Sequence, residues 1–170
     1  MALSKIQAES MNLADTFAFT GTVSGASLAG TGAFAARFAS PGTWQTISNG
    51  NILPFNNASN DDSFDTYTLF NTSTYKYTAP ATGVYLFWYS IYTAEQDTGN
   101  EFGFFKNNAD LDYSQGSDNK FTAMHSTDND HMQTVSIVVP LTNGDTMAVV
   151  ACADSDYYPP HSSWGGCRLK

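Results

Sequence analysis

From residue 33 onward, short runs of apolar and aromatic residues recur between clusters of turn-forming residues. Several runs repeat with a period of two, the spacing of a β-strand. The clusters between them, such as SNGN at 48–51 and TNGD at 142–145, are rich in Asn, Gly and Asp, as in tight turns. No helical spacing longer than two turns follows residue 15. The pattern predicts an all-β sandwich or jelly roll.

One run, GVYLFWYSIY at 83–92, is apolar or aromatic on both of its faces. A strand in an antiparallel sandwich normally has one apolar face and one face in water. A strand that is apolar on both faces is covered on both sides, and the partner sheet covers only one. We expect a second copy of the protein to cover the other side. The alternative is a long loop of the same chain.

Residues 1–32 differ from the rest of the chain. The apolar residues Ile6, Leu13, Phe17 and Phe19 stand there among small and polar ones, and Gly-rich links follow. A segment of this length cannot bury a core of its own. It is either a disordered leader or an ordered anchor to a larger assembly, and we favour the anchor because its apolar side chains need a surface. The sequence thus predicts an arm, 1–32, and one domain, 33–170.

Charge and composition exclude several classes of function. The net charge is −9 and the chain has only seven Lys and Arg, which are scattered, so a nucleic-acid partner is not expected. No window approaches the ~18 consecutive apolar residues of a membrane span. The start, MALSKIQAESMN, lacks the apolar core of a signal peptide, so we expect a protein that folds inside a cell without classical export.

No catalytic constellation stands out in the sequence. The sequence GASLAG around Ser27 misses the G-x-S-x-G spacing by one residue, and it lies in the predicted arm. The histidines do not have the H-E-x-x-H spacing of a zinc site. We therefore predict a protein that is not an enzyme and that has no catalytic residues or organic cofactor.

Several acidic loops raise the question of a metal ion. The oxygen-rich stretch DNDH, which holds Asp128 and Asp130 before His131, is the candidate for Ca²⁺, an ion that takes six to eight oxygen ligands. None of the loops has the EF-hand spacing, and solvated turns of an acidic protein are the simpler interpretation. The prediction is no cofactor, with Ca²⁺ as the one candidate ion.

The loop ADSDYYPPHSS at 153–163 is the candidate ligand site. We expect Tyr157 and Tyr158 to be exposed there, with His161 behind them. Aromatic rings flanked by Asp and Ser suit the stacking of a sugar and hydrogen bonds to its hydroxyls. The same residues also suit a well-packed loop at the edge of an oligomer, and both interpretations stay open.

The order of the segments resembles the C1q domain of the C1q/TNF superfamily over about residues 33–170. The resemblance rests on six short motifs in the family's order, none of them decisive alone: GAFAARF, ISNGNILPFN, GVYLFWY after a P-x-x-G turn, FGFFKNNADL, VSIVVPLTNGDTMAVV and SSWGGCRL. No Gly-X-Y collagen triplets precede the domain, which separates the chain from complement-type members.

The resemblance implies a ten-stranded jelly roll that forms a homotrimer. In the family, the sheet with the first and last strands packs around the threefold axis, so the last strand, SSWGGCRL, is expected beside GAFAARF. Cys152 and Cys167 are then expected on opposite sheets as two buried free thiols. The residues predicted to lie in the core or at the trimer interface are Phe34, Leu86, Trp88, Trp164 and Leu169.

The leader KIQAESMNLADTFAFTGTVSGAS is similar to the leaders of phage tail-fibre and head-fibre proteins. This similarity implies a virion structural protein, assembled in the host cytoplasm. The trimeric head would be a fibre tip, a decoration or a receptor-binding knob, and the arm would dock onto another virion protein. Its outside partner would be a host glycan or receptor. The alternative is a C1q-like recognition module, secreted or on the surface of a cell or spore.

Overall fold

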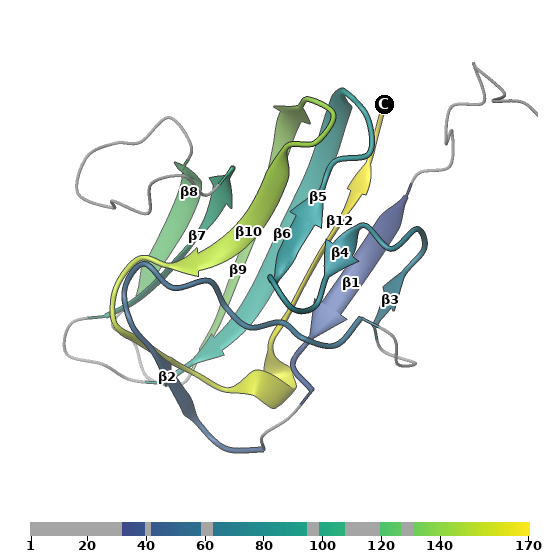
Figure 1. Cartoon of the computed structure of the whole chain (residues 1–170). Helices are drawn as coiled ribbons and strands as arrows, with labels where there is room; N and C mark the ends of the chain where they lie inside the picture. The colour runs from purple at the N-terminus through teal and green to yellow at the C-terminus, as the bar shows by residue number, and fades with distance from the viewer. Residues whose placement is uncertain (1–31, 40–41, 59–62, 95–98, 108–119, 127–130) are drawn as a thin grey trace, which may run out of the picture. The chain divides into compact units, whose positions relative to one another are not determined.

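The computed structural model describes residues 32–39, 42–58, 63–94, 99–107, 120–126 and 131–170. All of them belong to one compact unit, Thr31–Lys170. The described residues form two antiparallel β-sheets that pack face to face, with one short 3₁₀ turn, η2 (Pro159–His161) (Figure 1). The predicted all-β jelly roll is confirmed, and the described residues form twelve strands, several of two or three residues, where ten were expected.

Sheet A contains both ends of the domain. Its order is β2-β11-β6-β12-β1-β3, and β9 pairs with the other edge of β6. The strands are β1 (Ala33–Arg37), β2 (Gln45–Ile47), β3 (Phe64–Asp65), β6 (Gly83–Thr93), β9 (His131–Leu141), β11 (Ser155–Tyr157) and β12 (Ser163–Arg168).

Sheet B covers one face of sheet A and has the order β4-β5-β10-β7-β8. Its strands are β4 (Phe70–Asn71), β5 (Lys76–Thr78), β7 (Asn100–Lys106), β8 (Lys120–Ser126) and β10 (Thr146–Ala151). Part of its outer side is closed by the segment after β2, where Ile52 bridges to Val150 and packs against buried Phe105 and Cys152. The domain's own chain thus supplies cover for sheet B.

The last strand lies between the first strand and the central strand of sheet A. Trp164 of β12 pairs with Ala36 of β1 on one side and with Tyr89 of β6 on the other. The expected placement of SSWGGCRL beside GAFAARF is therefore confirmed. Beyond the strand, the backbone of Lys170 still accepts a hydrogen bond from the Val84 N–H, at 2.9 Å, so this pairing continues to residue 170.

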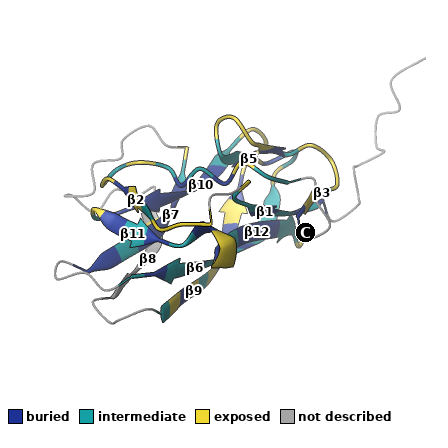
Figure 2. Cartoon of the chain, turned by 90° about the horizontal axis from the view of Figure 1, so that it is seen from below, coloured by how far each residue is buried: buried dark blue, intermediate teal, exposed yellow. Residues whose placement is uncertain are grey.

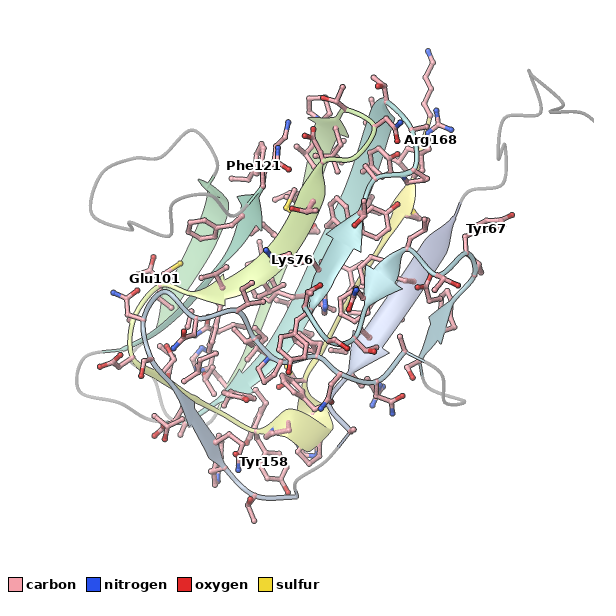
Figure 3. All side chains as sticks on the ribbon, in the orientation of Figure 1. Tyr67, Lys76, Glu101, Phe121, Tyr158 and Arg168 are labelled. Carbon is pink, nitrogen blue, oxygen red and sulfur yellow. The ribbon has the colours of Figure 1, made fainter. Side chains whose placement is uncertain are left out.

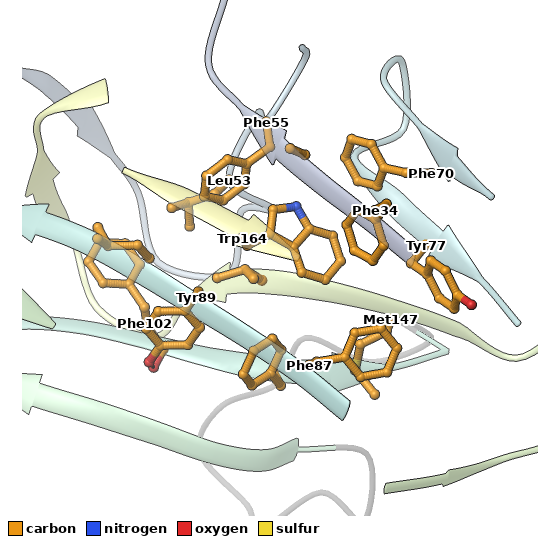
Figure 4. Close-up of a cluster of buried hydrophobic side chains, with 14 of the residues drawn as sticks. Phe34, Leu53, Phe55, Phe70, Tyr77, Phe87, Tyr89, Phe102, Met147 and Trp164 are labelled. Atoms are coloured by element: carbon orange, nitrogen blue, oxygen red, sulfur yellow. Dashed lines mark hydrogen bonds between the residues drawn. The ribbon is translucent and has the colours of Figure 1, made fainter. Parts of the chain in front are cut away.

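Aromatic rings from both sheets fill the core (Figure 4). Phe34 of β1 stacks on Phe70 and Tyr77 of sheet B, with ring centroids 5.2 and 5.0 Å apart. The indole of Trp164 meets the Phe34 ring edge-on at 4.7 Å and is fully buried. Such pairs add about 0.5–1.5 kcal/mol each beyond the burial of their area. The first and last strands are therefore joined by side chains as well as by backbone pairing.

Two glycines in β12 make room for two rings of β6. A Cβ added to Gly166 would lie 2.3 Å from the Phe87 ring, on the core side of the sheet. A Cβ added to Gly165 would lie 2.9 Å from the Trp88 indole, on the outer side. Any larger residue at either position would displace an aromatic ring or a strand.

The two cysteines lie on opposite sheets, as expected. Cys152 directly follows β10 of sheet B and is buried, while Cys167 in β12 of sheet A is half-buried. Both are free thiols. The expectation that both are buried is thus confirmed for Cys152 only.

The side chain of Asp145 closes the turn at residues 142–145, between β9 and β10. Asp145 accepts a hydrogen bond from the Thr142 N–H at 2.7 Å and pairs with the Lys106 ammonium, also at 2.7 Å. Partial desolvation opposes ionisation, but the hydrogen bonds from Asn107, Lys106 and Thr142 outweigh it and hold the pKa of Asp145 well below its usual range. Gly144 has a φ of +87°, which the turn requires.

Candidate functional site

The outer face of sheet A, opposite the core, is the candidate functional surface. Side chains alternate strictly along β6, and every second one from Tyr85 to Thr93 is buried against sheet B. The residues between them, beginning with Val84, Leu86 and Trp88, point to the other side and are only half-buried. The described residues therefore leave one apolar face of β6 uncovered (Figure 2).

Neighbouring strands extend this face into a continuous apolar surface. Val138 of β9 pairs with Leu86 and is 63% exposed, and Leu169, just beyond β12, is 50% exposed. Phe64 of β3 pairs with Ala35 of β1, which puts both on this face, and it is 49% exposed. We call this surface the apolar patch. It comprises Ala33, Ala35, Phe64, Val84, Leu86, Trp88, Val138, Pro140 and Leu169.

The outer face is almost free of charge. Among the outward-facing positions of β1, β6, β9 and β12, Arg37 is the one charged side chain. Charged residues make up only 14% of the whole chain, so the exposed apolar side chains distinguish this face more than its lack of charge does. Contiguous exposed apolar patches of this kind mark interaction surfaces in folded proteins.

A second group of side chains at the surface, all with aromatic rings, lies at the opposite end of sheet A, with Trp44 and His161 exposed and Tyr92 and Tyr158 half-buried. Trp44, just before β2, stacks on Tyr92 of β6 with ring centroids 5.7 Å apart and an interplanar angle of 24°. It also contacts Tyr158 at 5.2 Å, and His161 of η2 packs against Tyr92 at 5.4 Å and Tyr158 at 5.0 Å. We call Trp44, Tyr92, Tyr158 and His161 the aromatic cluster.

The apolar patch and the aromatic cluster are separate. Small hydroxyl side chains occupy the outer face between them, and Ser90 and Thr134 there lie 3.0 Å apart and share a hydrogen bond. Figure 3 shows Tyr158 at one end of the domain and Arg168, the last residue of β12, at the other. The two regions can therefore meet different partners.

Comparison with solved structures identifies the fold. The domain matches the globular domain of the zebrafish complement 1qA protein with a TM-score of 0.60 and 14% identity, over 82% of this chain and 98% of that one. It matches the Eiger TNF structure from S. frugiperda with a TM-score of 0.55 and 18% identity, over 82% and 93%. It matches murine APRIL with a TM-score of 0.56 and 10% identity, over 81% and 98%.

The domain has the C1q/TNF-like fold. No protein-family model and no curated protein sequence matches the chain. The predicted resemblance to the C1q/TNF superfamily is thus confirmed at the level of the fold, on structure rather than on overall sequence identity.

The C1q/TNF-like domain divides the five predicted core or interface residues into two groups. Phe34 and Trp164 lie in the core. Leu86, Trp88 and Leu169 lie on the outer face and belong to the apolar patch. Phe34 and Trp164 are buried by side chains of the same chain. The role of Leu86, Trp88 and Leu169 at an interface stays a prediction.

One expectation for the candidate ligand loop is wrong. Tyr157 is not exposed. It lies in β11 as part of the core cluster, with its ring 5.1 Å from that of Phe38, and only 4% of it is accessible. Burial, aided by the nearby Tyr75, raises the pKa of Tyr157 to about 12. Strand alternation points Tyr158 the opposite way, so of the predicted ligand residues Tyr158 and His161 remain at the surface.

The sequence did not indicate Trp44 and Tyr92 as members of the same surface. The two are far apart in the chain, and the register of β2, β11 and β6 brings them together. The one available signal was that Tyr92 falls on the same face of its strand as Leu86 and Trp88.

Several predicted residues lie outside the described part of the chain. These are the four anchor residues, Ile6, Leu13, Phe17 and Phe19, and the calcium candidates, Asp128 and Asp130. Among the described residues, no group of three or more His, Cys, Asp and Glu side chains is placed to hold a metal ion. The described part of the chain also contains no helix of the length and apolarity needed to span a membrane.

Proposed function

We propose that the protein is a homotrimeric, non-enzymatic recognition module whose subunits associate through the apolar patch. The observation that carries the proposal is the uncharged, exposed apolar face of sheet A, centred on Leu86, Trp88 and Val138. The resemblance to the C1q/TNF superfamily implies a trimer packed on the sheet that holds the first and last strands. In this chain, that sheet carries the patch.

The physical reason for association is the removal of the patch from water. Each Å² of apolar surface that is buried contributes roughly 25 cal/mol. The central residues need little reordering, because Trp88 is already held over Gly165 and Leu86 lies within the sheet. Three identical subunits around a threefold axis form a closed assembly, which leaves no patch exposed to recruit further copies.

Light scattering on the purified protein tests this proposal. At micromolar concentration we expect a mass three times 18.4 kDa. Val138→Asp places a charge in the interface, where desolvating an unpaired carboxylate costs several kcal/mol, so we expect trimer affinity to fall at least ~100-fold. Thr78→Asp is the matched control, since Thr78 is an exposed residue of similar shape on sheet B.

The control is expected to remain trimeric with an unchanged melting temperature. A monomeric wild-type protein at micromolar concentration would refute the trimer. An unchanged mass for Val138→Asp would show that any trimer uses a different surface.

We place this trimer on a phage particle, as a fibre tip, decoration or receptor-binding knob. The support is the similarity of the leader to phage-fibre leaders, together with its apolar residues, which fit an anchor to another virion protein. Mass spectrometry of gradient-purified particles is expected to detect the protein. Leu13→Asp with Phe17→Asp should remove it from particles and leave the trimer intact in light scattering. Its absence from particles would favour a secreted or cell-surface recognition module.

A further inference from the structure

We propose that the aromatic cluster binds a neutral pyranose sugar, with the exposed face of Trp44 as its stacking platform. This inference rests on the proposed function, because it names the ligand class of a recognition module. The cluster is formed within a single chain, so it does not depend on the trimer. It is also distinct from the apolar patch.

The rings of the cluster are held in place before any ligand arrives. Trp44 contacts Tyr92 and Tyr158, and His161 contacts the same two tyrosines from η2. Each ring therefore touches at least two others, and little side-chain freedom remains to be lost on binding. Trp44 is nevertheless 42% exposed, so part of its indole stays free for a ligand.

The backbone beneath the cluster is equally well fixed. The Tyr158 N–H donates to the Tyr92 carbonyl at 2.8 Å. The Ser162 hydroxyl donates to the Tyr158 carbonyl at 2.8 Å and accepts from the Tyr92 N–H at 3.1 Å. Buried Pro159 begins the η2 turn between them. A rigid platform of this kind is suited to holding a ligand.

The cluster has an exposed apolar neighbour, Met132 opposite Tyr92, and a polar border on its β11 and β2 side, which favours a sugar over a purely apolar partner. The next outward-facing pair of the sheet is Asp156 with Thr46, which adds a carboxylate and an exposed hydroxyl beside the rings. A pyranose presents C–H groups on one face and hydroxyls around its rim, so it matches an aromatic platform with a polar border.

The charge around the cluster favours a neutral ligand. The elements β2, β11 and η2 contain no Lys or Arg, and Asp156 is acidic. The whole chain carries a net charge of −9, which repels anionic sugars. Sialic acid and sulfated glycans are therefore expected to bind less well than neutral hexoses. A trimer would present three such sites, and this multivalency can raise the apparent affinity for a glycan surface by 10²–10⁴-fold.

The test uses the full-length protein and defined probes. The methyl glycosides of glucose, galactose, mannose and N-acetylglucosamine are titrated, with N-acetylneuraminic acid for comparison, and binding is followed by saturation-transfer NMR. We expect saturable binding of at least one neutral glycoside, with Kd of about 1 mM. Trp44→Ala should weaken it at least ~10-fold, and Trp44→Phe, which keeps a ring, should weaken it less.

Phe121→Ala is the matched control, because Phe121 is an exposed aromatic on the β8 edge of sheet B, away from the cluster (Figure 3). It should leave sugar binding unchanged. Three results would overturn the proposal. None of the four neutral glycosides binds, Trp44→Ala binds them as well as the unmodified protein does, or only N-acetylneuraminic acid binds. Light scattering on the same samples reports separately on the trimer, so failure of one proposal is not mistaken for failure of the other.

Discussion

A chain that lacks residues 165–170 is expected to be unfolded and monomeric. The deletion removes most of β12, the strand that connects β1 to β6 in sheet A. Both neighbours then lose their ladder hydrogen bonds, each worth about 1 kcal/mol. The Trp164 indole also loses the strand that positions it at the centre of the core. The combined loss is comparable to the ~5–15 kcal/mol that stabilises a typical domain.

Circular dichroism and light scattering on the truncated chain measure this effect. Removal of residues 1–6 is the matched control, because it deletes the same number of residues outside the compact unit Thr31–Lys170. The control should keep the β-sheet spectrum and the melting temperature of the full chain. A truncated chain that melts cooperatively near the same temperature would show that β12 is dispensable.

Gly166→Ala is expected to destabilise the domain by about 3 kcal/mol or more, at the upper end of the range for overpacked cores. The new Cβ would lie 2.3 Å from the Phe87 ring and 2.8 Å from the Leu86 carbonyl oxygen. The ring cannot swing away freely, because Tyr77 and Trp164 pack against it. The backbone oxygen belongs to the central strand of the sheet. Relief therefore requires β6 and β12 to separate.

Chemical denaturation of Gly166→Ala compared with Gly42→Ala isolates this steric effect. A Cβ at Gly42 would meet no atom within 4 Å, so the control changes the residue type without a clash. It should remain within about 0.5 kcal/mol of the unmodified protein, as is usual for surface substitutions. Equal stabilities for the two variants would contradict the close contact between Gly166 and Phe87.

The sequence predicted those parts of the fold that local patterns encode. Period-two alternation from Val84 to Tyr89 identified both faces of β6, since a strand's side chains alternate whatever its neighbours are. The turn at 142–145 was visible because Asn, Gly and Asp favour turn geometry. The pairing of the last strand with the first came instead from the resemblance to a family, because no local pattern encodes a contact of such long range.

The sequence was less informative about the surface. Tyr157 and Tyr158 look alike in the sequence, and only the register of β11 against β2 and β6 determines which of them is buried. The contribution of Trp44 to the aromatic cluster depends on the same register. The sequence shows the glycine pair of β12 but not what packs against it. The structure adds that each glycine leaves space for a ring, Trp88 outside and Phe87 inside.

The position of β12 also determines when the domain can fold during its synthesis. This strand is translated after every other strand of the domain, yet it belongs between β1 and β6. Until the ribosome has released it, β1 and β6 expose unpaired edges that invite aggregation. Folding of sheet A therefore waits for the synthesis of its last strand. Chains interrupted before Ser163 never complete the sheet, so only fully translated domains can enter an assembly built on it.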